Sequence, residues 1–276
     1  MSSRTLAAIL LVMLLPAQES RPAKVEKLSE WPALKDTDKE KAMALVAQFR
    51  KDEKLHQEAR AGLIAFGPAV APLLLQQVTD RPENINAQLF AVFDAILGPP
   101  HASLMARESD KQKFELRKYL VRRLCRFVDP DLAPILKKAT KDKDEEVKFC
   151  GALGLLALRQ KDGLPLVMEH CRTDWPVARQ MIGEVLPAAR STECGQWLID
   201  LAAKSSAVER TNALRLARYL ATKEQTSSIK PYLDAEDHNV KKEAINALRV
   251  IHGEAPMEDL SVFQAIDQAK EWKAKA

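Results

Sequence analysis

The sequence contains little glycine and few aromatic residues: 9 Gly occur in 276 residues, and Phe, Trp and Tyr together make up 5%. Ala and Leu dominate the apolar residues instead, a composition that favours helices over β-strands. The 46% hydrophobic and 29% charged content excludes both a disordered chain and a bundle of membrane spans. A formal net charge of +4 is too small to identify a class of partner.

The sequence also lacks the spacings that active sites and metal sites require. No two of its five histidines lie four residues apart, so the helical pair of metal-binding histidines is missing. No G-x-S-x-G, Walker or G-x-G-x-x-G sequence occurs. Glu145 and Glu146 are adjacent, but we expect them in the first turn of a helix, where carboxylates offset the helix dipole. We therefore predict a protein that is not an enzyme and that uses no metal and no cofactor.

Cysteine is scarce, and its spacing matches no metal-binding motif. The four residues Cys125, Cys150, Cys171 and Cys194 are separated by 25, 21 and 23 positions, too far for a zinc knuckle. Within the repeat pattern described below they occupy unlike positions, which we expect to lie far apart. Buried free thiols are therefore favoured, and we predict no disulfide.

Only one long apolar run is present, the ten residues from Leu6 to Leu15, preceded by Arg4 and followed by Pro16-Ala17. This layout is typical of a secretory signal peptide, and the run is shorter than the ~20 residues of a membrane-spanning helix. We predict a signal peptide over residues 1–17 and a polar lead-in over 18–37. A buried N-terminal helix is the alternative. Export from a bacterial cytoplasm, to the periplasm or the medium, is the expected localisation.

The rest of the chain repeats one helical pattern seven times. In the clearest copy, Val240, Ala244, Leu248 and Ile251 lie on one face of a 3.6-residue period. The first apolar positions of the copies, 30 to 32 residues apart, are Leu55, Ile85, Leu116, Val147, Val177, Val208 and Val240. The expected helix caps, three positions earlier in five copies, are Asp52, Asp144, Asp174, Ser205 and Asp237.

A second apolar series alternates with the first at steps of 31 residues, through Leu73, Leu104, Ile135, Leu166 and Trp197. Each unit is therefore a helix pair that must stack on its neighbours to bury its apolar stripe. We predict an all-α fold, a right-handed α-α superhelix of about seven helix pairs over residues 38–252. A C-terminal capping helix with a basic tail follows over 253–276, with Leu260, Phe263, Ile266 and Ala269 facing inward.

The sequence Gly67-Pro-Ala-Val-Ala-Pro-Leu-Leu74, together with Asp237-x-x-Val240-Lys-Lys-x-Ala244-x-x-Ala247-Leu248, resembles HEAT repeats of the short bacterial kind. The resemblance covers roughly residues 38–252. It implies that the second helix of each pair lines a concave face that holds a partner.

One electrostatic feature accompanies this pattern. Residues 111–126 contain seven basic residues and one acidic residue, a net charge of +6. Basic residues recur near the start of the later second helices, where equal positions would form a column that could attract an acidic partner. The candidate partner-binding residues are Arg117, Lys118, Arg122, Lys148, Arg179, Arg210, Lys241 and Lys242. A solvated helix face paired with nearby acids is the alternative interpretation.

Three functions fit these observations. The favoured one is an exported, non-enzymatic scaffold whose concave face holds a protein or another acidic partner. The second is a nucleic-acid-binding protein similar to the HEAT-like DNA glycosylases, which the predicted signal peptide disfavours. The third is a helper of the bilin lyase type, which also contains short HEAT repeats, although no Cys or His cluster here suggests pigment handling.

Overall fold

A computed structural model describes residues 26–81, 85–111 and 113–275. The predicted signal peptide and the first part of the lead-in lie outside these residues. Within them the protein is all-α, with fifteen α-helices and no β-strand. The helices are α1 (Asp36–Gln48), α2 (His56–Ala65), α3 (Ala71–Gln77), α4 (Asn86–Ile96), α5 (Ala102–Ser109), α6 (Phe114–Leu124), α7 (Ala133–Ala139), α8 (Glu145–Ala157), α9 (Leu164–Thr173), α10 (Trp175–Val185), α11 (Thr192–Lys204), α12 (Ala207–Leu220), α13 (Thr226–Ile229), α14 (His238–Ile251) and α15 (Val262–Ala274).

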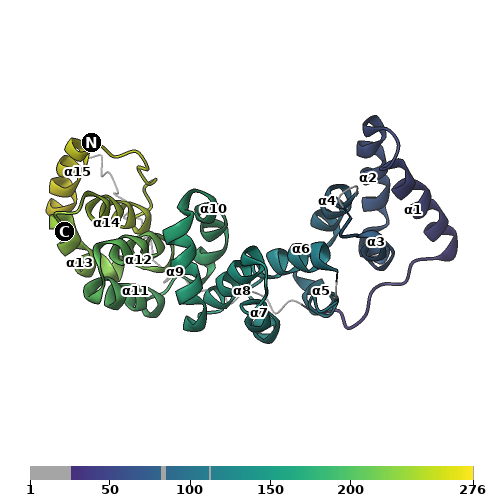
Figure 1. The fold of residues 1–276 in the computed structure, drawn as a ribbon, viewed down its shortest axis with the longest axis horizontal. Coiled ribbons are helices and arrows are strands. Elements are labelled where there is room, and N and C mark those ends of the chain that lie inside the picture. The colour runs from purple at the N-terminus through teal and green to yellow at the C-terminus, as the bar shows by residue number, and fades with distance from the viewer. Residues whose placement is uncertain (1–25, 82–84, 112, 276) are drawn as a thin grey trace, which may run out of the picture.

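The helices form an elongated, arched stack of two layers (Figure 1). Successive helices pair as α1 with α2 through α13 with α14, which gives seven pairs followed by α15. The second helices of the pairs lie on one side of the stack, and first helices such as α3, α5 and α7 lie on the other (Figure 1). This is the helical solenoid that the two alternating series predicted.

The first apolar position of the predicted face is exposed in two of the seven copies, although in α12 the next two positions, Asn212 and Leu216, are buried. Val240, Ala244 and Leu248 are fully buried, whereas Val177 is 71% exposed and Val208 is 58% exposed. The caps of these two helices also differ from the others. In contrast to the caps at Asp52, Asp144 and Asp237, the Asp174 side chain accepts no cap hydrogen bond, and Ser206 rather than Ser205 caps α12. In α10 the buried face lies one position later than predicted, with Ala178 and Ile182 inward, which corresponds to a rotation of about 100°.

Gly151 lets α8 approach α7 closely. A Cβ atom at this position would lie 2.7 Å from the Leu136 carbonyl oxygen and 2.8 Å from the Ala139 Cβ. Real Cβ atoms do not come so near to backbone atoms, so any side chain would push the two helices apart. Gly151 therefore serves the close packing of α7 and α8.

The capping helix buries a different face from the one predicted. Ala265, Ala269 and Trp272 of α15 are buried, but Phe263 is 82% exposed and Ile266 is 38% exposed. The inward assignment of Phe263 and Ile266 is therefore wrong. The reason is the position of α15: its start lies beside His238, whose imidazole hydrogen-bonds the Leu260 carbonyl, and its end places Trp272 beside His252. Helix α15 thus runs in the same direction as α14, at the end of the stack.

The four cysteines are buried, as the composition favoured. The expected separation is wrong for one pair, because the Cys125 thiol lies near enough to the Cys150 thiol to affect its titration. This neighbour and burial both raise the pKa of Cys150. The two residues meet because Cys125 follows the end of α6 and Cys150 lies in α8, adjacent second helices whose packing brings these positions together.

No single described helix is long and apolar enough to cross a membrane. Two strongly bent combinations, Glu53–Ala65 with Gly67–Gln77 and Asn86–Ile96 with Pro99–Ser109, reach the required length and composition only when both helices are counted together.

Candidate partner-binding surface

The second helices line the inner side of the arch. The Arg126 guanidinium at the end of α6 donates to the Glu184 carboxylate on α10 at 2.7 Å, although 58 residues separate them. Figure 1 shows α6, α8 and α10 on the side toward which the stack bends, and this contact bridges two repeats there. We call the surface of α2, α4, α6, α8, α10, α12 and α14 the inner face. The concave position of the second helices, which the HEAT resemblance implied, is thus observed.

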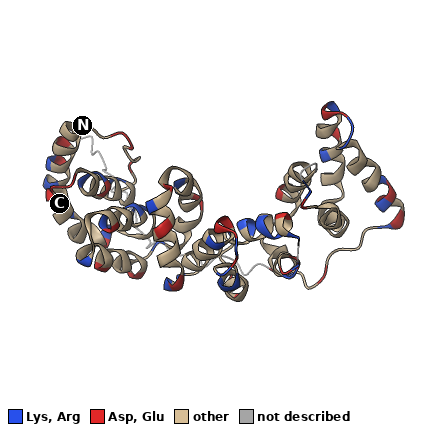
Figure 2. Cartoon of the chain, in the orientation of Figure 1, with Lys and Arg blue, Asp and Glu red and all other residues tan. Residues whose placement is uncertain are grey.

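The basic residues near the start of α6 are paired with acids of the next unit. Arg117 Nε lies 2.8 Å from an Asp142 carboxylate oxygen, and Lys118 Nζ lies 2.7 Å from Glu146. The hydrogen bond to Glu146 raises the pKa of Lys118. Figure 2 shows the basic residues of α6 with acidic residues on the neighbouring helix. These ion pairs join adjacent units, so much of the +6 charge read from the sequence is neutralised.

Arg122, the third predicted residue on this helix, is more available to a partner than Arg117 and Lys118 are. Its side chain is 55% exposed, and its Nη1 lies 3.8 Å from Glu146, a carboxylate that Lys118 already binds.

Two further predicted residues make local contacts. Lys148 pairs with Glu145 on the same helix at 2.6 Å. Arg210 donates to the carbonyl oxygens of Ala202 and Ser205, and its guanidinium lies over the Tyr232 ring at 5.7 Å. Arg210 therefore secures the turn between α11 and α12.

The last three predicted residues lie near the C-terminal end of the inner face. Lys242 donates to the Glu258 carbonyl at 2.9 Å, and Arg179 Nη1 lies 4.0 Å from the Glu258 carboxylate. The Lys241 side chain makes no hydrogen bond or ion pair with any described residue. The structure thus brings Arg179 and Lys242 together around one acidic residue, and it divides the eight predicted residues among separate contacts.

Glu258 belongs to an acidic connection that lies along α14. We call residues 253–261 the strap. It contains Glu254, Glu258 and Asp259 and no basic residue. The residues of α14 that contact its backbone follow one helical stripe: Arg249 donates to the Ala255 carbonyl, Asn246 exchanges two hydrogen bonds with Met257, Lys242 donates to the Glu258 carbonyl, and His238 contacts the Leu260 carbonyl.

The order of these contacts fixes the direction of the strap. Residue numbers rise along the strap as they fall along α14, so the strap runs antiparallel to the helix. The distances at Asn246 are 3.1 Å to the Met257 carbonyl oxygen and 2.7 Å from the Met257 amide nitrogen. A single side chain therefore satisfies both backbone polar groups of Met257, as a neighbouring β-strand would.

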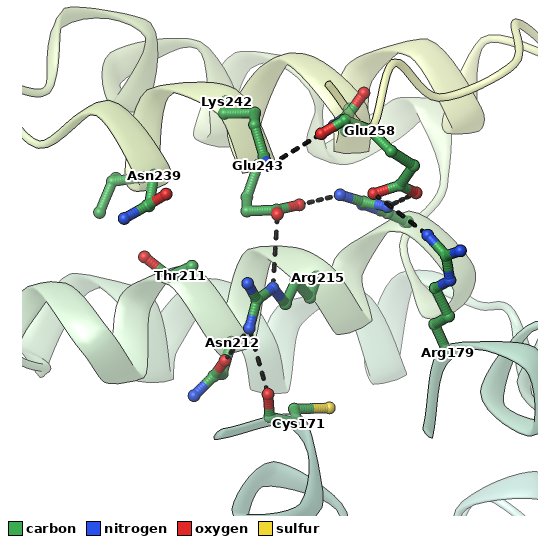
Figure 3. Close-up of polar contacts among 12 residues, drawn as sticks. Cys171, Arg179, Thr211, Asn212, Arg215, Asn239, Lys242, Glu243 and Glu258 are labelled. Atoms are coloured by element: carbon green, nitrogen blue, oxygen red, sulfur yellow. Dashed lines mark hydrogen bonds and ion pairs between the residues drawn. The ribbon is translucent and has the colours of Figure 1, made fainter. Parts of the chain in front are cut away.

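The Glu258 side chain enters a cluster of arginines. It accepts a hydrogen bond from Arg218 at 2.8 Å, and Arg218 also donates to Glu243. Glu243 in turn accepts from Arg215, whose other bonds go to Asn212 and the Cys171 carbonyl (Figure 3). The side chains of Arg218 and Glu243 are 0% and 1% exposed, so the central pair of the cluster is shielded from water.

An aromatic ring forms the base of this cluster. The Arg215 and Arg218 guanidinium groups lie 5.1 Å and 5.4 Å from the centre of the Trp175 ring. Burial alone would lower the pKa of Arg218, but the Glu243 and Glu258 carboxylates raise it above its ordinary value. Arg218 therefore stays charged although it is buried, and it binds an acidic side chain from the strap.

Reasoning from the sequence missed the central residues of this arrangement. Arg218, Glu243 and Asn246 lie on second helices but were not proposed as functional, and Glu258 lies in a segment read as part of a cap. A usable signal was present, since Glu243 and Asn246 are polar residues directly beside the apolar positions of the clearest copy. The repeat pattern ends before the strap, so it did not indicate the direction in which the strap runs.

The described residues contain no group of three or more His, Cys, Asp or Glu side chains placed to hold a metal ion. The polar groups of the inner face form ion pairs and hydrogen bonds to backbone, a chemistry that suits the recognition of another chain.

Comparison with known proteins identifies one family. Residues 102–187, which run from the start of α5 to just beyond α10, match the HEAT repeats family. A search of curated proteins finds no match to the chain. HEAT repeats are found and no catalytic domain is identified, and such repeats in general bind proteins.

Proposed function

Because residues 102–187 are HEAT repeats, we propose that this protein is an exported, non-enzymatic scaffold that binds an extended acidic segment of a partner protein along its inner face. The chemistry of the partner segment follows from the side chains that face it.

The observation that carries this proposal is the strap. An acidic segment of the chain itself already lies on the inner face, and two of the residues proposed to bind an acidic partner, Arg179 and Lys242, contact it. Side chains along one stripe of α14 hydrogen-bond to the backbone of the strap, and arginines from neighbouring units bind its Glu258 carboxylate. The strap is an intramolecular example of the recognition that we propose for a partner.

The ion pairs on the inner face favour a protein segment over duplex DNA as the partner. Phosphate backbones are bound by rows of cations that release counterions, whereas Arg117 and Lys118 are already held by Asp142 and Glu146. A few available cations suit a segment with occasional carboxylates better than a polyanion.

The export part of the proposal rests on the apolar run from Leu6 to Leu15. N-terminal sequencing of the native protein tests it. We expect a mature chain that begins near Gln18, and a chain that begins at Met1 or Ser2 would contradict export.

A binding measurement tests the scaffold. Two fluorescein-labelled peptides, one repeating Glu-Ala-Pro-Met three times and one with Gln in place of Glu, are titrated with the full chain and followed by fluorescence anisotropy. We expect the Glu peptide to bind more tightly than the Gln peptide and than a DNA duplex of similar length. Equal affinity for the two peptides, or tighter binding of DNA with a steep loss in salt, would contradict the proposal.

A further inference from the structure

A second arginine cluster lies on the inner face, between α4 and α6. Its pocket of about 290 Å³ is lined by Phe90, Asp94, Tyr119, Arg122, Arg123 and Arg126. We call it the arginine pocket. It lies next to the contact between Arg126 and Glu184 that spans two repeats, on the concave side of the arch.

The wall of the arginine pocket is held in place by its own contacts. The Phe90 and Tyr119 rings stack with centres 4.2 Å apart and planes 6° apart. The Tyr119 hydroxyl donates to Asp94 at 2.8 Å, and burial together with this bond raises the pKa of Tyr119. The hydroxyl therefore stays protonated, and two fixed rings form one side of the pocket.

One arginine of the arginine pocket has no close acidic partner of its own in the part of the chain that the structure describes. Glu184 binds Arg126 at 2.7 Å, and Asp94 lies 3.5 Å from Arg123. Arg123 also donates to the carbonyl oxygens of Asp94 and Leu97, yet its Nε is buried without a hydrogen-bond partner among the described residues. Arg122 is the surplus cation, because Lys118 is the closer partner of Glu146.

The arginine pocket has the same components as the site that holds Glu258. That site consists of Arg179, Arg215, Arg218 and the Trp175 ring, with Glu243 as a resident carboxylate. The arginine pocket likewise has three arginines beside aromatic rings, with Asp94 as a resident carboxylate. The C-terminal site is filled by an acidic side chain from the strap, whereas no segment of the described chain places a carboxylate against Arg122 more closely than Glu146 does.

We propose that the arginine pocket binds one aspartate or glutamate side chain of the partner's acidic segment. Arg122 pairs with the incoming carboxylate, and the methylene groups next to it pack on the Phe90 and Tyr119 rings. This inference rests on the proposed function and assigns a specific place to it. It predicts that recognition is centred between α4 and α6, on the part of the inner face beyond the reach of the strap.

Two measurements test the arginine pocket, with variants that remove one positive charge each. Arg122→Gln removes the surplus cation, and Arg50→Gln removes an exposed arginine just after α1 as a matched control. In the anisotropy titration, we expect Arg122→Gln to weaken the Glu peptide by about ten-fold and Arg50→Gln to leave it within about two-fold. Unchanged affinity in Arg122→Gln would overturn the pocket while leaving the proposed function intact.

The second measurement needs no partner peptide. N-acetylglutamate N-methylamide is added to the ¹⁵N-labelled full chain, and the arginine side-chain Nε–H signals are recorded by NMR. We expect the signals that disappear in Arg122→Gln and Arg123→Lys to shift with this probe and not with the glutamine analogue. No shift would overturn the pocket even if the peptide binds. A larger shift with inorganic phosphate than with the glutamate probe would overturn the choice of a carboxylate.

Discussion

Arg218 and Glu243 form an ion pair from which water is almost excluded, with side chains 0% and 1% exposed. The pair joins α12 to α14, and Arg218 extends the link to Glu258 in the strap. Two adjacent helix pairs and the acidic segment that crosses them therefore share one buried charge network.

Glu243→Gln should destabilise the C-terminal units strongly. It leaves the buried Arg218 without a fully charged buried partner, and breaking one side of a buried ion pair costs roughly 3–5 kcal/mol. Urea unfolding monitored by circular dichroism measures the change. Glu145→Gln, at an exposed pair on α8, is the control and should change stability by less than about 1 kcal/mol. Equal effects of the two substitutions would contradict the role of the buried network.

The face that α10 buries can be tested by substituting two neighbouring residues. Val177 is 71% exposed and Ala178 is 2% exposed, so Val177→Asn should change stability by no more than about 0.5 kcal/mol. Ala178→Asn buries a polar amide and should cost about 1–3 kcal/mol. Thermal melting of both variants decides between the two registers, because the register predicted from the sequence requires the opposite order.

Two helical glycines should respond in opposite directions to alanine. Gly151→Ala places a Cβ 2.7 Å from the Leu136 carbonyl oxygen, and such overpacking should cost about 1–3 kcal/mol. Gly183→Ala meets its nearest neighbour, the Tyr219 ring, at 3.5 Å, so the gain in helix propensity should stabilise the chain by about 0.5–1 kcal/mol. Chemical denaturation checks both signs. Stabilisation by Gly151→Ala would show that α7 and α8 pack less closely than described.

Asn246→Ala should loosen the strap. It removes both hydrogen bonds to Met257, and the expected cost is about 1–3 kcal/mol because the Met257 backbone groups lose their partner. Hydrogen exchange should become faster at the Met257 amide. Asn239→Ala is the matched control on the same helix, since this exposed asparagine makes no side-chain hydrogen bond to a described residue. Unchanged exchange at Met257 in Asn246→Ala would show that the strap is held by other contacts.

The architecture could be predicted from the sequence because two apolar series, one for the first helices and one for the second helices, repeat with the same period. The exact start of a helix could not be predicted, because Ser205 and Ser206 are equivalent by type, yet only Ser206 forms a capping box with Glu209. Val208 lies in the first turn of α12 and is 58% exposed.

The candidate surface was predicted less completely than the fold. The basic residues were found, but their partners were not, because Arg117 meets Asp142 and Arg126 meets Glu184 only once the units are stacked. The strap was missed for a related reason. Its contacts depend on α15 running parallel to α14, and no local pattern in residues 253–261 specifies this path.

The most direct test of the account is to map where an acidic segment touches the chain. The Glu peptide of the anisotropy experiment is synthesised with a benzoylphenylalanine at its centre, photo-crosslinked to the full protein and located by mass spectrometry. We expect crosslinks on α4 and α6, around Phe90 and Arg122, that are lost when the Gln peptide is used. Crosslinks confined to the outer helices α3, α5 and α7, or equal crosslinking of the two peptides, would contradict it.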